Sequence, residues 1–132
     1  KRLTKIESAV SNIGKLAKQL PSQYKERLSK RIEELAGGVN LEPQALAREV
    51  ALFADRSDIT EELVRLDHHL SFFRKTLGTA GEVGKQLDFI SQEIHRETNT
   101  IASKAANHHI QKYVIGMKTE VEKIREQIQN IE

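Results

Sequence analysis

The chain has 132 residues, with 21 lysines and arginines against 19 acidic residues, and it contains no cysteine or tryptophan. The lack of cysteine excludes disulfide and thiolate chemistry, and a net charge of +2 is too small to mark the whole surface as a nucleic-acid footprint. Because no apolar run approaches the ~18 residues of a membrane span and no signal peptide opens the chain, we expect a cytoplasmic protein without a membrane partner.

Apolar residues recur at helical spacing from one end of the chain to the other, which predicts an all-α fold. The first helix is expected from Leu3 to Leu20, where Pro21 forces a kink or a new start. A second helix is expected from Ser22 to Ala36 and is ended by the pair Gly37-Gly38.

Two helices are expected next in the chain. A short one runs from Pro43 to Asp55, because proline is favoured in a first turn. The segment from Asp58 to Glu61 resembles a capping box, so it predicts the start of a longer helix. The apolar residues that this longer helix is expected to bury are Ile59, Leu63, Leu66, Leu70, Phe73 and Leu77. A flexible loop is predicted from Gly78 to Gly84.

The last helix, from Ile110 to Ile131, carries an almost continuous heptad seam. With a similar seam in the first helix, it predicts an elongated helical bundle, or a long antiparallel helical hairpin with coiled-coil-like seams. We expect one helical domain with long N-terminal helices at 1–40, motif-bearing helices at 41–107 and a C-terminal helix at 108–132. Seams left uncovered within one chain favour a homo-oligomer.

The helix expected from Gly84 to Lys104, ending near Asn107, is too polar for packing to be its only role. Glu93, Glu97 and Lys104 fall within about 40° of one another along one edge of its apolar stripe. Charges at the margin of a core are half-desolvated, as functional groups often are. The alternative is a solvated flank with one ion pair. The stripe consists of Leu87, Ile90, Ile94, Ile101 and Ala105.

The preceding helix repeats this design, since Glu62, Arg65 and His69 lie along one edge of its own stripe. Carboxylates and imidazoles on facing helices can hold a divalent metal, which activates water and neutralises a phosphodiester. The competing interpretation is that Arg65 and Lys104 simply neutralise the carboxylates. If each carboxylate is paired with arginine or lysine, the metal hypothesis fails. The predicted metal ligands are Glu62, His69, Glu93 and Glu97.

A second polar ridge on the Gly84 helix contains amide and hydroxyl side chains that can read a phosphate or a sugar edge. With Lys85 and Arg96 close by, it predicts an RNA-contacting ridge; the alternative is an ordinary wet helix face. Its members are Asp88, Gln92, Asn99 and Ser103.

Three segments are distinctive: Glu49 to His69, Gly84 to Lys104, and the closing Arg125 to Glu132. They resemble the C-terminal domain of the YicC/YloC endoribonuclease family, formerly grouped as stress-induced proteins. The chain departs from the usual family pattern at Asp55, where glutamine is common, and at His95, where asparagine is common. The positions that match the family motif are Glu49, Arg56, Asp58, Glu61, Glu62, His69, Asp88, Gln92, Glu93, Arg96, Glu97, Asn99 and Lys104.

The resemblance implies a bacterial endoribonuclease that needs a divalent metal, Mg²⁺ or Mn²⁺, cleaves RNA phosphodiester bonds and assembles into oligomers. It also implies a missing N-terminal domain of similar length that contains strands, so we expect this fragment alone to be weak or inactive.

Combining the stripe edges with the resemblance gives a set of candidate site residues. We expect Glu93, Glu97 and His69 to be catalytic. Cleavage can use a metal-bound water, or the RNA 2′-OH with His69 as general base. The residues expected to bind RNA or its phosphates are Arg56, Arg65, Arg96, Asn99 and Lys104. The alternative function is a non-catalytic helical oligomerisation or RNA-binding module, in which the charged edges are ion pairs that fix helix register.

Overall fold

The computed structural model describes residues 2–36, 42–79, 81 and 83–131. This part of the chain forms six helices and no strand, so the all-α prediction is confirmed. None of the described helices is long and apolar enough to cross a lipid bilayer. The helices are α1 (Arg2–Ala17), α2 (Leu20–Ala36), α3 (Pro43–Ser57), α4 (Thr60–Leu77), α5 (Gly84–Lys104) and α6 (His108–Ile131).

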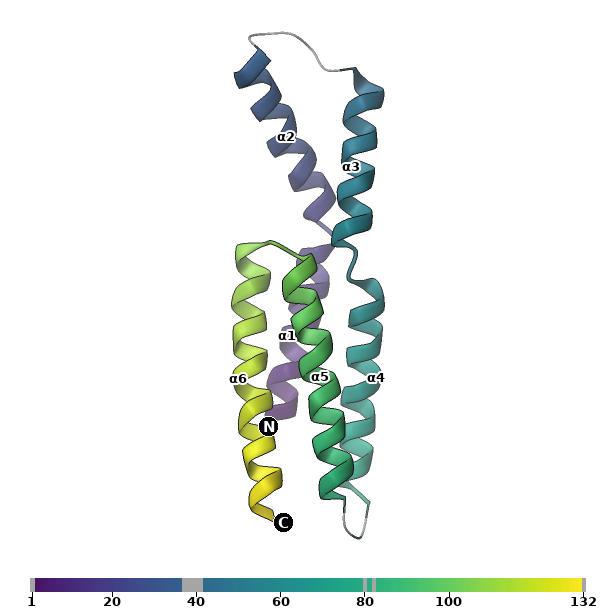
Figure 1. The fold of residues 1–132 in the computed structure, drawn as a ribbon, viewed down its shortest axis with the longest axis vertical. Helices are drawn as coiled ribbons and strands as arrows, with labels where there is room; N and C mark the ends of the chain where they lie inside the picture. The colour runs from purple at the N-terminus through teal and green to yellow at the C-terminus, as the bar shows by residue number, and fades with distance from the viewer. Residues whose placement is uncertain (1, 37–41, 80, 82, 132) are drawn as a thin grey trace.

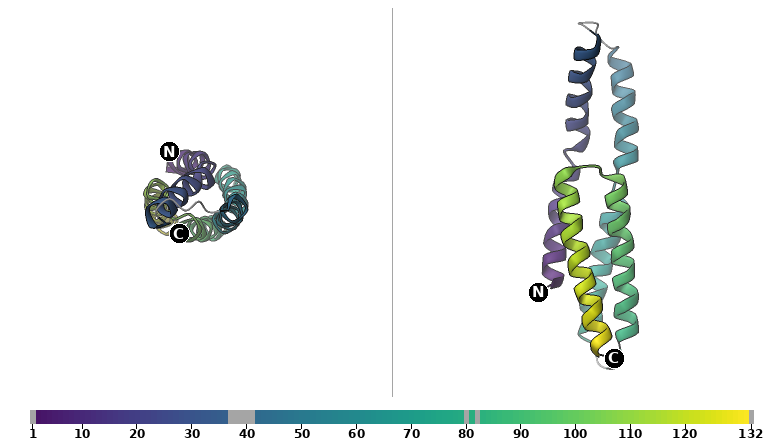
Figure 2. Two further views of the ribbon diagram at one scale, coloured as in Figure 1. Left: turned by 90° about the horizontal axis from the view of Figure 1, so that it is seen from above. Right: turned by 60° about the vertical axis from the view of Figure 1, so that its left-hand side comes forward.

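Helices α1, α4, α5 and α6 form a four-helix bundle in which each helix runs antiparallel to its neighbours (Figure 1). Helices α2 and α3 pack on each other and project from one end of this bundle, so the molecule is elongated (Figure 2). The seams of α1 and α6 face each other within the bundle. They therefore contribute to a shared core with α4 and α5 and do not pair as an isolated hairpin.

The core of the bundle consists of the apolar stripes that the sequence predicts. All five predicted stripe residues of α5 are buried, and so are the seam residues of α6 from Ile110 to Ile128. Burying one such aliphatic side chain contributes about 1.5–3 kcal/mol, so these stripes decide how the helices are oriented. The prediction was wrong for Leu77, which is exposed because it lies at the last turn of α4 near the open end of the bundle.

Pro21 lies in the first turn of α2, where proline needs no hydrogen-bond donor. Helix α1 ends at Ala17 and α2 begins at Leu20, so the chain restarts here as the sequence predicts. The α2–α3 pair is held by a stacked contact between Tyr24 and Phe53, whose ring centroids are 4.0 Å apart. The helix-ending pair predicted at 37–38 lies outside the described residues.

The corner between α3 and α4 is organised by Asp58. Its carboxylate accepts hydrogen bonds from the backbone N–H of Thr60, at 3.0 Å, and from the Thr60 hydroxyl. Both bonds lower the pKa of Asp58 below its ordinary value of 3.8, and the bond from the hydroxyl has the larger effect. The described residues show this half of the predicted capping box, while the second bond, from the backbone N–H of Asp58 to the carboxylate of Glu61, is not formed in them.

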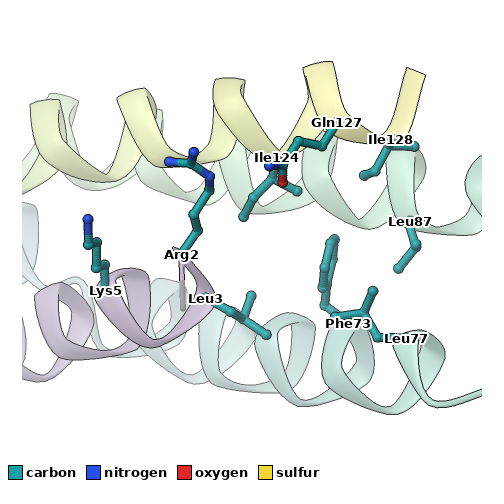
Figure 3. Close-up of a pocket in the computed structure, with 9 residues that line it drawn as sticks. All are labelled: Arg2, Leu3, Lys5, Phe73, Leu77, Leu87, Ile124, Gln127 and Ile128. Carbon is teal, nitrogen blue, oxygen red and sulfur yellow. The ribbon is translucent and has the colours of Figure 1, made fainter. Parts of the chain in front are cut away.

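At the end of the bundle where α1 begins, an apolar opening of about 480 Å³ lies between α1, α4, α5 and α6. Phe73, Leu77 and Leu87 line one side of it and Ile124 and Ile128 of α6 line the other (Figure 3). The bundle is therefore incompletely packed at this end.

The contact of α1 with α4 includes an ion pair whose strength depends on pH. Arg74 donates to both carboxylate oxygens of Glu7, and this hydrogen bonding holds the pKa of Glu7 below its ordinary value of 4.5. Because the pKa of Glu7 is lower in the folded state, the ion pair stabilises the protein at pH values above the pKa of the unfolded chain. This contribution is lost as the pH falls through the pKa of the folded state. We expect Glu7→Gln to be destabilising at about pH 6 and to cost less at about pH 3, as measured by urea unfolding followed by circular dichroism. An equal cost at both pH values would contradict this assignment.

Candidate functional site

The seam between α4 and α5 reaches the end of the bundle that lies next to the α2–α3 pair (Figure 1). Charged side chains of both helices gather along the seam at this end. Lys104 Nζ of α5 lies 2.9 Å from Glu62 Oε2 of α4, and Arg65 Nε of α4 lies 3.0 Å from Glu97 Oε2 of α5. These two crossed contacts fix the antiparallel register of the helices. We call Glu62, Arg65, Glu97 and Lys104 the seam cluster.

The carboxylates of the seam cluster lie inside and its cations lie outside. The side chain of Glu62 is only 4% exposed, whereas those of Arg65 and Lys104 are 44% and 39% exposed. Burying a carboxylate is costly unless it is paired and hydrogen-bonded. Arg65 and Lys104 supply these partners, and the contacts hold both cations in place at the surface.

Arg65 connects the two acidic residues. Its Nε donates to Glu97, while its NH2 group lies 3.4 Å from Glu62 Oε2 and its NH1 group 3.6 Å from the exposed Glu61. The hydrogen bond to Glu97, followed by the charges of the three glutamates, raises the pKa of Arg65 above its already high ordinary value. The guanidinium is therefore charged at every physiological pH and keeps N–H groups that can reach an anion outside the bundle.

Lys104 spans two elements. Besides Glu62 it lies 3.5 Å from the backbone carbonyl of Asp58, at the corner that starts α4. The other carboxylate oxygen of Glu62, Oε1, is buried and has no hydrogen-bond partner among the described residues. An unpaired buried acceptor is costly, so Glu62 lies where stability alone does not favour a carboxylate.

The four predicted metal ligands do not form one group. The described residues contain no set of three His, Asp or Glu side chains arranged to hold a metal ion. Glu62 and Glu97 both accept from Arg65, and Glu93 lies 3.9 Å from Arg96 on its own helix. The side chains of the described structure therefore do not fit a bound divalent metal, because cations of the protein occupy the carboxylates.

His69 lies one turn beyond Arg65 on α4, and Glu93 lies one turn before Glu97 on α5. Because the helices are antiparallel, both residues belong to the next level of the same seam. Both side chains are half-buried, and in the described structure they form no ion pair with each other. His69 and Glu93 thus lie on the helix edges that the sequence predicts, but one helical turn away from the seam cluster.

The remaining predicted RNA-binding residues are dispersed. Arg56 is exposed at the end of α3, and Arg96 and Asn99 are exposed on the outer side of α5. The second polar ridge has a structural role at one end, because Asp88 accepts from Gln92 at 3.0 Å and from Arg125 of α6 at 3.3 Å.

Part of the polarity of α5 also serves packing. The buried hydroxyls of Ser91 and Thr98 donate to the carbonyls of Leu87 and Ile94, at 2.8 and 2.7 Å. Small hydroxyl side chains that bond to their own helix can enter a core at little cost. Packing of this kind does not account for Glu97 and Lys104, the two members of the seam cluster on α5.

Comparison with known proteins identifies the family. Residues 13–132 match the family described as endoribonuclease YicC-like, C-terminal. The chain belongs to this YicC-like family. It is 41% identical over 128 residues to a probable endoribonuclease YicC of Clostridioides difficile (strain 630), and 39% identical over 131 residues to one of Haemophilus influenzae.

These alignments cover 96% and 97% of this chain but only 44% and 45% of the two relatives. The YicC-like chain therefore spans less than half of the length of the curated relatives that it matches. All four residues of the seam cluster lie within the matched region, so the cluster belongs to the YicC-like part of the sequence.

Proposed function

We propose that this chain is the C-terminal helical part of an RNA-cleaving endoribonuclease, and that its seam cluster binds the RNA backbone at or beside the cleaved bond. The observation that carries the proposal is the arrangement of Arg65 and Lys104, two surface cations oriented by nearly buried carboxylates. Both curated relatives are named probable endoribonucleases, which supports RNA as the substrate.

The position of the cations in the seam cluster supports a role in phosphodiester cleavage. Negative charge grows on the phosphate oxygens in the transition state, and donors fixed in advance stabilise it at no reorganisation cost. Glu62 and Glu97 supply this orientation by holding Arg65 from two directions. A substrate phosphate would then bind to the outward N–H groups of Arg65 and to the ammonium group of Lys104.

Two routes for the nucleophile fit this arrangement. In one, the RNA 2′-OH attacks the neighbouring phosphorus, a general base takes its proton and the 5′-oxygen leaves with a proton; His69, one turn from Arg65, is the candidate base. In the other, water attacks directly. The routes leave different ends, a 2′,3′-cyclic phosphate in the first and a plain monoester in the second, so analysis of the products distinguishes them.

The requirement for a divalent cation that the family resemblance implies stays a prediction for the full-length protein. In this structure the carboxylates of Glu62 and Glu97 are both engaged by Arg65. Cleavage of a labelled single-stranded RNA by the full-length protein, with and without EDTA, tests the requirement. The isolated 132 residues, assayed in parallel, should cleave weakly or not at all.

The site assignment is tested by Glu97→Gln, which should reduce cleavage at least tenfold because Arg65 loses its strongest anchor. Glu7→Gln is the matched control, since Glu7 pairs with Arg74 on the opposite edge of α4. Glu93→Gln tests the next level of the seam separately. Wild-type cleavage by the Glu97→Gln, Glu93→Gln double variant would overturn the assignment.

A second candidate function is a non-catalytic helical module, which is favoured by the contact of both cluster carboxylates with cations of the protein. In that case the ion pairs only fix the register of α4 and α5. The two functions make different predictions for Glu97→Gln: a module loses stability without losing cleavage, whereas the proposed site loses cleavage even where the variant is fully folded.

A further inference from the structure

Two phenylalanines are exposed on α4 and α5, although the other two in the chain are not. Phe72 is 53% exposed and Phe89 is 63% exposed, whereas Phe73 is buried and Phe53 is stacked on Tyr24. An exposed phenylalanine forgoes the large gain that burial of its ring would bring. The packing of the described bundle does not explain this pair.

The register of the seam places both rings at one level. Phe72 lies seven residues after Arg65, and Phe89 lies eight residues before its partner Glu97. At 1.5 Å per residue, the two positions are displaced along the antiparallel helices in the same direction by about 10.5 and 12 Å. They therefore lie opposite each other, roughly two helical turns from the seam cluster.

Both phenylalanines also lie toward the outer side of the α4–α5 seam. Seven residues bring Phe72 back to within about 20° of Arg65 around α4. Phe89 lies one turn before Glu93, which is itself on the seam edge of α5. One continuous face thus carries the two rings at one end and the seam cluster at the other.

Three exposed cations lie near the rings. Lys75 follows Phe72 by one turn, Lys85 precedes Phe89 by one turn, and Arg96 follows Phe89 by two turns; all three are exposed. Within the described residues neither lysine forms an ion pair, and Arg96 has only the 3.9 Å contact with Glu93. Separated aromatic rings among cations are complementary to single-stranded nucleic acid, whose bases are apolar faces joined by phosphates.

We propose that Phe72 and Phe89 form a base-stacking platform for single-stranded RNA, with Lys75, Lys85 and Arg96 holding the backbone that leads to the seam cluster. The inference rests on the proposed function and adds to it how the substrate is held. Stacking on an aromatic ring accepts any base, so the platform selects single-stranded RNA without selecting its sequence.

The test measures binding of a fluorescein-labelled single-stranded RNA to the full-length protein by fluorescence anisotropy. The RNA carries 2′-O-methyl groups, and its length is checked on a gel after each measurement. We expect Phe72→Ala and Phe89→Ala each to raise Kd by about 10-fold or more, because base–aromatic stacking is lost. Tyrosine at either position should restore binding, whereas leucine, which is apolar but has no ring, should not.

Ile115→Ala is the matched control, since Ile115 is 66% exposed but lies on α6, outside the α4–α5 seam. The charges are tested by the double variant Lys75→Ala, Lys85→Ala. It should reduce the slope of log Kd against log salt by about 1.4, as expected when two phosphate contacts with a single strand are lost. An RNA with abasic sites supplies the reciprocal test, because the Phe→Ala effects should disappear on it.

The results that overturn the platform are distinct from those that overturn the proposed function. If the wild type binds and cleaves RNA and the double Phe→Ala variant binds equally well, the platform is wrong and the function stands. If leucine restores binding fully, or if the double variant changes only the oligomeric mass measured by light scattering, the face is an apolar protein contact. If the wild type neither binds nor cleaves RNA, the proposed function fails, and the platform fails with it.

Discussion

Replacing Arg65 with lysine should reduce RNA cleavage by the full-length protein on the order of 100-fold, the loss typical of removing one preorganised donor from a site of developing negative charge. Arg65 reaches Glu97 through Nε and Glu62 through NH2, so its orientation depends on a planar group with several N–H donors. Lysine keeps the charge but has a single nitrogen, which cannot hold both contacts while presenting a donor to a phosphate. Single-turnover cleavage of a labelled RNA measures the loss.

Arg74→Lys is the control for this experiment. Arg74 lies on the same helix, is exposed to a similar degree and donates to both carboxylate oxygens of Glu7, but it faces α1 instead of α5. We expect this variant to cleave like the wild type. Equal losses in the two variants would mean that arginine on α4 serves stability generally, and an unchanged Arg65→Lys enzyme would remove the seam cluster from the reaction.

Helical periodicity was sufficient to predict which edges of α4 and α5 carry charge. Spacing of 3.6 residues puts Glu62 and Arg65 on one edge of α4, and Glu97 and Lys104 on one edge of α5, and the structure brings these two edges together. The apolar stripes decide this, because burying them leaves each helix only one orientation toward the core. The helix restart at Pro21 was predictable for a similarly local reason.

Periodicity could not predict what the charged side chains do when the edges meet. The metal hypothesis assumed that the carboxylates converge, but this depends on which rotamers bring Arg65 between Glu62 and Glu97. His69 and Glu93 occupy the correct edge at the next level, a displacement of one turn that only the register of the two helices determines.

Replacing Lys104 with methionine should destabilise the folded protein by about 2–3 kcal/mol, near the lower end of the cost of breaking a buried ion pair, because Lys104 is itself partly exposed. The cost arises mainly from Glu62, whose carboxylate would stay buried with one oxygen unpartnered and the other bonded only weakly to Arg65. The loss should be smaller in a Glu62→Gln background, since a neutral amide needs no counter-ion. Urea unfolding of the four proteins in this double-mutant cycle should give a coupling energy of about 1–2 kcal/mol.

Arg125→Met provides the comparison. Arg125 pairs with Asp88 across α5 and α6 at 3.3 Å, but both side chains are about one-third exposed, so the expected cost is below about 1 kcal/mol. If Lys104→Met costs no more than Arg125→Met, burial of Glu62 does not govern the seam cluster, and Lys104 is available to RNA without penalty. If the cost and the coupling are as large as expected, the protein keeps a costly buried carboxylate in order to orient surface cations. A module that only had to join two helices could use apolar residues there at no loss of stability, so such a result favours a seam cluster that acts on a substrate.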